Sequence, residues 1–502
     1  MNTYIIIILC YLVALTIMNF WKSRQVKDSD DMMLAGRSIP IYKMVFTLIC
    51  TWIGSGTFIA GAEFAAKAGW SSLWLPAGAW IGIIIIYFLA FKIRTFGQYT
   101  VGDILEVRYG SLARIVGAIA IIISFTVIVS YQFKAGGYIL NAISDGKISQ
   151  EQGTFMAFLF VTLFTAIGGM IAVANTDLPN GIIILTSTIL STPLVMWAAG
   201  GWSTLKTILP ESHFHVFSSE FGGNPYLKIP AIGLSTLLLL LGVQSMYQKF
   251  YAARSPKEAR KAAGLWVFGT IIVETVAIVI AVFAAAHFWP EIQSGTMDAA
   301  EVIIQAAKRM IPLPVGVLLL GAATAVVIST GMNYLLSPTT TMIRDIYVRY
   351  IRKETEKTQA QERKKVILQK GLIIILGILA YIMATRMASV LESAYFAYTI
   401  YGAAITPALI GALASKRVTR VAGLVSIVSG TIITVFLKLA GYIWPSIMVP
   451  VGDPNGDPFG IPIIYPALGV ALLSLVIISF FTKPPEKEVL SKFFPEKKKK
   501  TQ

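Results

Sequence analysis

Runs of about twenty apolar residues recur along this 502-residue chain, and they restrict its fold more than any other feature. Hydrophobic residues make up 56% of the chain and charged residues only 14%, a balance typical of proteins that lie mostly within a bilayer. Backbone polar groups in a bilayer must bond to one another, so each run is predicted to be a helix. The sequence predicts an all-α polytopic membrane protein, a single transmembrane domain over 1–502. We expect thirteen transmembrane helices: 3–21, 44–66, 72–91, 115–142, 154–174, 180–200, 229–248, 264–288, 312–340, 371–385, 392–414, 421–441 and 461–481.

The distribution of Lys and Arg predicts which side of the cell membrane each loop faces. Most of the 42 Lys and Arg residues fall in alternate loops of this topology. Cytoplasmic loops carry an excess of these residues, so we expect the N-terminus outside and the C-terminus in the cytoplasm. The first run has no small-residue cleavage site, which favours a retained helix over a signal peptide. The net charge of +16 does not indicate a nucleic-acid partner, because the basic residues lie in short loops beside the lipid bilayer: 22–43, 92–114, 249–261, 344–370, 416–420 and 483–502.

The segment AATAVVISTGMNYLLSPTTTMIRDIY, at 322–347, carries two adjacent hydroxyls deep inside an apolar run. Hydrocarbon cannot solvate hydroxyls, so Ser329 and Thr330 are expected to face protein or a cavity. Two hydroxyl oxygens with a few backbone carbonyls suit a small alkali cation. The alternative is that both hydroxyls bond to carbonyls one turn earlier in their own helix, as is common in membrane helices.

Four segments resemble the sodium:solute symporter family, which includes proline, pantothenate, sugar and choline carriers. The resemblance runs from about residue 34 to residue 414, with the segments in the family's order. The segments are LAGRSIPIYKMVFTLICTWIGSGTFIAGAEFAAKAGW at 34–70, TAIGGMIAVANTD at 165–177, YQKFYAARSPKEARKA at 247–262 and the hydroxyl-bearing segment at 322–347.

The resemblance implies a leucine-transporter-type core of two inverted five-helix repeats, at 44–200 and 229–414. An additional helix and loop at 1–43 would precede this core, and two helices with a basic tail at 415–502 would follow it. The chain itself adds support, because glycines interrupt the helix that opens each half, as GSG at 54–56 and as Gly242.

The resemblance also implies a sodium site, formed by the carbonyls of Cys50, Ile53 and Val326 and the hydroxyls of Ser329 and Thr330. A broken helix frees carbonyls for such a site, and Gly54 and Gly56 lower the cost of the break. The alternative is that GSG only allows close helix packing.

Asp177 is expected to follow its helix at the cytoplasmic side, where a carboxylate would receive sodium on its way into the cell. A helix cap or a solvated loop charge is the alternative.

The family's substrate site lies at the membrane midplane. Tyr131 and Val243 replace aromatic residues of the choline carriers, which argues against choline. Gly56 and Thr57 replace polar residues of the sugar carriers. By this resemblance, the positions of the present chain that correspond to the family's substrate site are Trp52, Ser55, Thr57, Tyr131, Lys134, Gln244, Ser245 and Tyr247.

Lys134 lies within a helix, where an unpaired ammonium is costly and needs an anion. It shares one helix face with Tyr131 and Tyr138, so it is expected to face the substrate cavity. A carboxylate-bearing solute would then supply the counter-charge. The alternative is a structural ion pair with Glu63 or Glu274.

The function that follows is sodium-coupled symport of a small polar organic solute, with one sodium ion per solute and a functional monomer. One alternative is a proton-coupled or sodium-independent carrier in which Lys134 acts as a surrogate cation. Another is a solute sensor without net transport. An enzyme is not expected, because the sequence contains no recognisable nucleophile–base set, metal-ligand cluster or phosphate loop.

Overall fold

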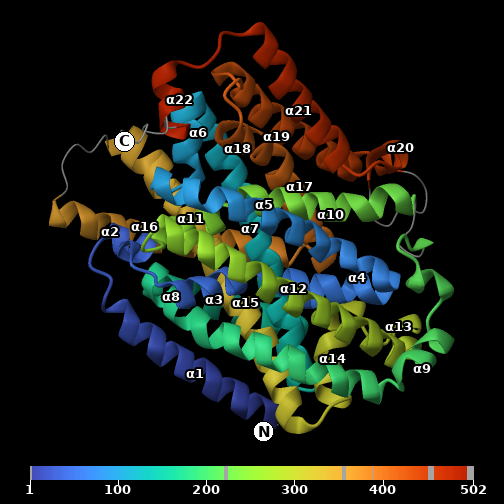
Figure 1. Ribbon diagram of the computed structural model, residues 1–502. Coiled ribbons are helices and arrows are strands. Elements are labelled where there is room, and N and C mark those ends of the chain that lie inside the picture. The colour runs from blue at the N-terminus through green and yellow to red at the C-terminus, as the bar shows by residue number, and fades with distance from the viewer. Residues whose placement is uncertain (1–2, 220–223, 353–357, 388, 450–456, 495–502) are drawn as a thin grey trace, which may run out of the picture.

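The computed structural model describes residues 3–219, 224–352, 358–387, 389–449 and 457–494 (Figure 1). Within these residues every regular element is a helix, and one isolated β-bridge joins Ile39 to Ala253. The predicted all-α class is confirmed.

The first part of the chain, up to residue 214, forms nine α-helices and four shorter 3-10 or π segments. Local capping sets some of the boundaries: Thr100 and Ser149 each form a capping box at a helix start. The elements are α1 Thr3–Ser23, α2 Ser29–Leu34, η1 Ala35–Arg37, α3 Ile41–Trp52, η2 Gly56–Ala60, α4 Gly61–Ala68, η3 Gly69–Leu73, α5 Trp74–Phe96, α6 Val101–Tyr109, α7 Ser111–Ile143, α8 Gln150–Ala198, α9 Gly201–Ile208 and η4 Glu211–Phe214.

The second part begins at Pro225, and the same local signals recur. Ser255 caps a helix that has Pro256 at its first position, and Thr358 forms a third capping box. The elements are α10 Pro225–Gly242, α11 Gln244–Ala252, α12 Pro256–His287, α13 Trp289–Gln293, η6 Ala299–Glu301, α14 Val302–Arg309, α15 Leu313–Thr341, η7 Met342–Arg352, α16 Gln359–Ala384, α17 Val390–Ala404, α18 Thr406–Ala414, α19 Arg420–Ile443, α20 Pro445–Met448, η8 Pro458–Gly460, α21 Ile464–Phe481 and α22 Lys487–Phe493.

Ten helical stretches of the described chain are long and apolar enough to cross a membrane, or eleven if α17 and α18, bent by 41°, form one span. The predicted runs 154–174 and 180–200 both fall in α8, and the predicted loop between them is helical. The non-helical residue of α8 is Gly169, with φ 58° and ψ −168°. A Cβ at this position would lie 2.4 Å from the Met32 sulfur, so close packing as well as backbone conformation requires glycine.

α15 lies at the centre of the molecule, where it packs against α7 and α8. α1 lies along α8 on one side, and α19 and α21 pair on the opposite side against α17 (Figure 1). Large apolar side chains remain exposed on the outer helices, including Phe480 at 73% and Phe481 at 87%. Such faces are expected of helices that meet lipid, because hydrocarbon is as apolar as the side chains themselves.

Two helix breaks divide spans near the middle of the bundle. α3 ends before Ile53, which is extended with φ −73° and ψ 99°, and η2 follows. α10 ends before Val243, also extended, and α11 follows. Tyr401 holds the second break: its hydroxyl donates to the Gly242 carbonyl at 2.8 Å and accepts the Gln244 N–H at 3.1 Å. Backbone groups freed by both breaks therefore lie inside the protein, where side chains bond to them.

Candidate functional site

Hydroxyls of α15 meet the freed carbonyls of α3 at the first break. Thr330 Oγ1 lies 3.1 Å from the Cys50 carbonyl oxygen and 3.2 Å from that of Ile53. Ser329 Oγ lies 3.3 Å from the Cys50 oxygen. These contacts connect two helices, in contrast to the alternative in which the hydroxyls bond within α15. Val326 is buried one turn before Thr330 on α15. The predicted sodium ligands therefore lie on two adjacent segments.

The carbonyls are available because the backbone changes its pairing after Ile53. The Thr57 N–H donates to the Gly54 carbonyl at 3.0 Å, one residue later than an α-helix would place the bond. A Cβ on Gly54 would lie 2.9 Å from Thr330 Cγ2 and 3.0 Å from its Oγ1. The absence of a side chain at Gly54 thus lets α15 approach the break. The GSG motif therefore serves both predicted purposes. It allows close helix packing, and it leaves backbone carbonyls free of helical hydrogen bonds.

Asp177 belongs to the same cluster, and its predicted position at the end of a helix is wrong. It lies inside α8, eight residues after the break at Gly169, and is fully buried. Its carboxylate accepts hydrogen bonds from Ser329 Oγ at 2.5 Å, from Asn333 Nδ2 at 3.5 Å and from the Thr47 hydroxyl. A solvated loop charge is excluded by this burial.

Lys249 is a residue of this cluster that sequence reasoning missed. It lies in α11 with no exposed surface, and its ammonium donates to the Asn333 amide oxygen and lies 3.1 Å from the Met170 sulfur. The Asn333 amide therefore connects Lys249 to Asp177. The available signal was an uncompensated Lys within the family-like segment at 247–262, but its partner lies on a helix more than 80 residues away in the chain.

A narrow cavity opens on the other side of the broken segment. Of the predicted substrate residues, Trp52 and Thr57 line it. Tyr398, Glu274 and Thr236, which were not in the predicted substrate set, add to its polar lining. Tyr131 lies just behind, with its hydroxyl 3.3 Å from that of Tyr398. The cavity and the oxygen cluster thus share the segment between α3 and α4.

Other predicted substrate residues are engaged elsewhere. Ser55 donates to the Gln132 amide oxygen at 2.7 Å, which ties the break to α7. Gln244 donates to Thr341 Oγ1 at 2.6 Å and to the Ser337 carbonyl at 3.0 Å on α15. Tyr247, on α11 with Ser245, donates its hydroxyl to the Leu241 carbonyl at 2.9 Å. These side chains hold the two breaks in place in this conformation.

Lys134 does not line this cavity. Its ammonium donates to the Met387 carbonyl, and its charged neighbours are Asp298 and Glu63. Lys134 and Tyr131 both lie on α7, one turn apart, but α7 is surrounded by protein on several sides. Although Lys134 follows Tyr131 by three residues on the same helix, its ammonium therefore does not reach the cavity.

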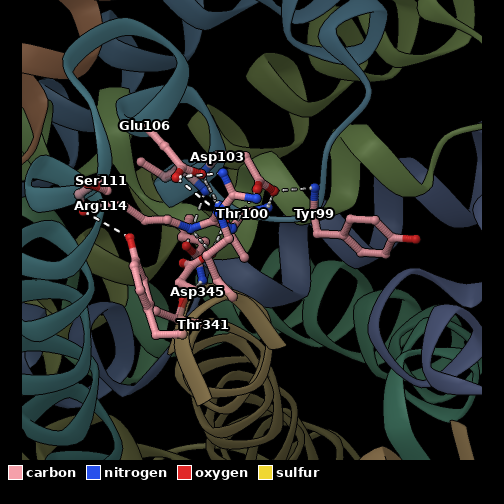
Figure 2. A network of polar contacts seen from close by, with 12 residues as sticks. Tyr99, Thr100, Asp103, Glu106, Ser111, Arg114, Thr341 and Asp345 are labelled. Atoms are coloured by element: carbon pink, nitrogen blue, oxygen red, sulfur yellow. Dashed lines mark hydrogen bonds and ion pairs between the residues drawn. The ribbon is translucent and has the colours of Figure 1, made fainter. Parts of the chain in front are cut away.

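A network of charges connects α6 and α7 with η7, the segment that follows α15. The Arg114 guanidinium lies 2.6 Å from the Asp103 carboxylate and 2.5 Å from that of Asp345, and it also pairs with Glu106 (Figure 2). Thr100 donates to Asp345 at 2.8 Å. Asp345 is fully buried, and its ion pair with Arg114 offsets part of the cost of burying the carboxylate.

A broken helix whose freed carbonyls meet hydroxyls of a second helix, beside a cavity, is the arrangement of a secondary transporter. The model of the sodium:solute symporter family matches residues 32–430. The chain belongs to this family, as the four motifs predicted. Sodium-coupled symport is the activity of the class.

The chain is similar to the sodium/proline symporters of Staphylococcus aureus strains JH9 and COL, with 24% identity over 495 residues, or 96% of this chain and 93% of each relative. A solved structure of a sodium-coupled sialic acid symporter, substrate-bound and outward-open, matches with a TM-score of 0.77 and 16% identity over 96% of this chain and 98% of that one. Mhp1, a nucleobase-cation-symport-1 family transporter, matches with a TM-score of 0.56 and 13% identity over 92% and 97%. These structures share the fold.

Proposed function

We propose that this protein carries a small polar organic solute into the cell together with sodium, by alternating access. The observation that carries the proposal is the pair of α15 hydroxyls set against the freed Cys50 and Ile53 carbonyls, at 3.1–3.3 Å. Oxygens at such distances need only small shifts to surround a sodium ion. The solute would occupy the cavity on the other side of the same broken segment.

The sodium ligands in this proposal are the carbonyls of Cys50, Ile53 and Val326 and the hydroxyls of Ser329 and Thr330. Asp177 hydrogen-bonds Ser329 and would receive the ion as it leaves inward. One sodium ion per solute is proposed, because one such set of oxygens lies against the break.

A carboxylate-bearing solute, such as an amino acid or organic acid, is the class proposed. The similarity to sodium/proline symporters favours an amino acid. Lys134 gives this solute class little support, because its ammonium donates to the Met387 carbonyl and lies outside the cavity lining.

We further propose thirteen membrane crossings in a functional monomer, with the N-terminus outside and inverted repeats at 44–200 and 229–414. α8 supports the count: at 1.5 Å per residue, a straight helix of 49 residues would be about 74 Å long, more than twice the roughly 30 Å hydrocarbon core. Division at Gly169 makes two crossings of suitable length.

Uptake into proteoliposomes tests the function. A panel of labelled amino acids and organic acids would be offered with an inward sodium gradient, or with potassium in its place. We expect at least one solute to accumulate only with the sodium gradient, and Thr330→Ala to abolish accumulation while Thr330→Ser retains it. Uptake driven by a proton gradient without sodium would support the proton-coupled alternative, and saturable binding without uptake would support a sensor.

A further inference from the structure

Glu274 presents a buried carboxylate to the cavity. It lies in the middle of α12 and is 3% exposed. Its Oε1 accepts the Trp52 indole N–H at 3.0 Å and is 3.4 Å from the Thr57 hydroxyl. Its Oε2 accepts the Trp80 indole N–H at 2.8 Å. All three donors are neutral, and each can only orient the carboxylate or share its charge.

No ion pair to Glu274 exists among the residues that the structure describes. Three other carboxylates in the described part of the bundle pair directly with cations: Glu63 with Lys67 at 2.7 Å, Asp345 with Arg114, and Glu392 with Lys438 at 2.7 Å, whereas Asp177 is connected to Lys249 through Asn333. A charged carboxylate within a membrane protein is costly unless a cation accompanies it. The ionised form of Glu274 therefore has no cation partner among the described residues, and a cationic ligand would supply one.

The surroundings of Glu274 select the kind of cation. Trp52 and Tyr398 place aromatic rings beside the carboxylate, and Leu75, Pro76 and Ile278 supply apolar walls. A sodium ion prefers several converging oxygens, but here indole N–H groups already bind both carboxylate oxygens. An organic ammonium, in contrast, is stabilised by one carboxylate and by aromatic faces.

We propose that Glu274 binds a positively charged nitrogen of the transported solute. The inference rests on the proposed symport function and narrows its solute to ammonium-bearing compounds, of which amino acids are one class. Thr57 would contribute a hydroxyl from the broken helix, so solute binding at Glu274 and sodium binding at Cys50 and Ile53 act on the same short segment.

Thermal unfolding of the purified full-length protein in sodium tests the proposal with matched probes. L-proline is compared with tetrahydrofuran-2-carboxylate, and L-alanine with L-lactate. Ethylammonium, a cation, and betaine, a zwitterion, present positively charged nitrogens of other shapes. We expect one or more ammonium-bearing probes to raise the unfolding temperature, because a ligand of the folded state stabilises it, and the oxygen analogues to leave it unchanged. In Glu274→Gln the affinity for the active probe should fall roughly 30-fold or more, as for the loss of one partner of a buried charge pair.

Glu63→Gln is the matched control, because Glu63 is equally buried but already paired with Lys67. It should retain the probe response. The proposal is overturned if the uncharged analogues stabilise as well as the ammonium probes, if Glu274→Gln retains the response, or if sodium stabilises the protein but no ammonium probe does. If the proposed sodium symport is itself wrong, the result is different: sodium alone would then leave the unfolding temperature unchanged relative to potassium.

Discussion

At the scale of single residues, the proposed sodium site and the Asp177 carboxylate form one connected cluster. Ser329 Oγ is within hydrogen-bonding distance of both Asp177 and the Cys50 carbonyl. Asn333 connects Asp177 to the Lys249 ammonium. The positive charge of Lys249 stabilises Asp177 but opposes a second cation nearby. We therefore expect the sodium affinity of the proposed site to depend on residues beyond its five proposed ligands.

Lys249→Met should remove this opposing charge. Direct buried pairs lose about 3–5 kcal/mol when one partner is removed, and we expect about 2 kcal/mol here, because Asn333 separates the charges. The unfolding temperature without sodium should therefore fall. Sodium affinity, measured by titrating the unfolding temperature, should rise roughly tenfold, or ~1.4 kcal/mol. Asp177→Asn in the same variant should restore stability without sodium. Unchanged sodium affinity in Lys249→Met would show that Lys249 is electrostatically separate from the site.

At the scale of elements, the break between α3 and η2 brings the proposed cation and solute sites together. Cys50 and Ile53 face α15, while Trp52 and Thr57 face the cavity. Ser55 is held between them by Gln132 of α7. A movement of this segment would therefore change both proposed sites at once, as the coupling of solute binding to sodium binding requires.

Gly54→Ala tests how closely α15 must approach the break. The new methyl group would lie 2.9 Å from Thr330 Cγ2, so Thr330 must shift away from the Cys50 and Ile53 carbonyls. We expect sodium affinity to fall roughly tenfold or more, or at least ~1.4 kcal/mol, by the same titration. Gly61→Ala is the control, because its methyl group would lie 3.4 Å from the nearest atom, in ordinary contact. Equal sodium affinities in the two variants would contradict the assigned geometry.

Local sequence patterns predicted the apolar helices and the hydroxyl pair of α15, because both depend on neighbours within one or two turns. The partnership of Thr330 with Cys50 came from the family resemblance. Three features were missed or misplaced: the burial of Asp177, the pairing of Lys249 with Asn333, and the cavity position of Glu274. Each depends on helices separated by more than 80 residues in the chain, and helix periodicity carries no information on which helices pack together.

At the scale of the whole molecule, the proposed transport cycle requires the Arg114 network to open before solute and sodium leave the protein on the cytoplasmic side. In the proposed topology it lies at the inner end, where it joins α6, α7 and η7 through Asp103, Glu106 and Asp345 (Figure 2). A buried, hydrogen-bonded charge cluster holds helices in one arrangement, so its loss should favour the open one.

Asp345→Asn should increase the population open to the inside. Cys50 reports this opening, because its buried thiol lies beside Asp177, and the chain's other cysteine, Cys10, can be replaced by Ser. We expect a small thiol reagent to modify Cys50 roughly tenfold faster, corresponding to ~1.4 kcal/mol in the opening equilibrium. Glu291→Gln, which disrupts an exposed ion pair with Arg309, should leave the rate unchanged. An equal rate in Asp345→Asn and the parent protein would contradict a gating role for the network.

Binding of radioactive sodium-22 to the purified protein tests the central claim most directly, because it requires no knowledge of the solute. The account predicts saturable binding of one ion per chain in the parent protein. It predicts loss of that binding in Ser329→Ala/Thr330→Ala, since the remaining carbonyls are too few to replace the ion's hydration shell. Conservative Thr330→Ser should bind sodium. Undiminished sodium binding in the double alanine variant, or none in the parent protein, would contradict the account.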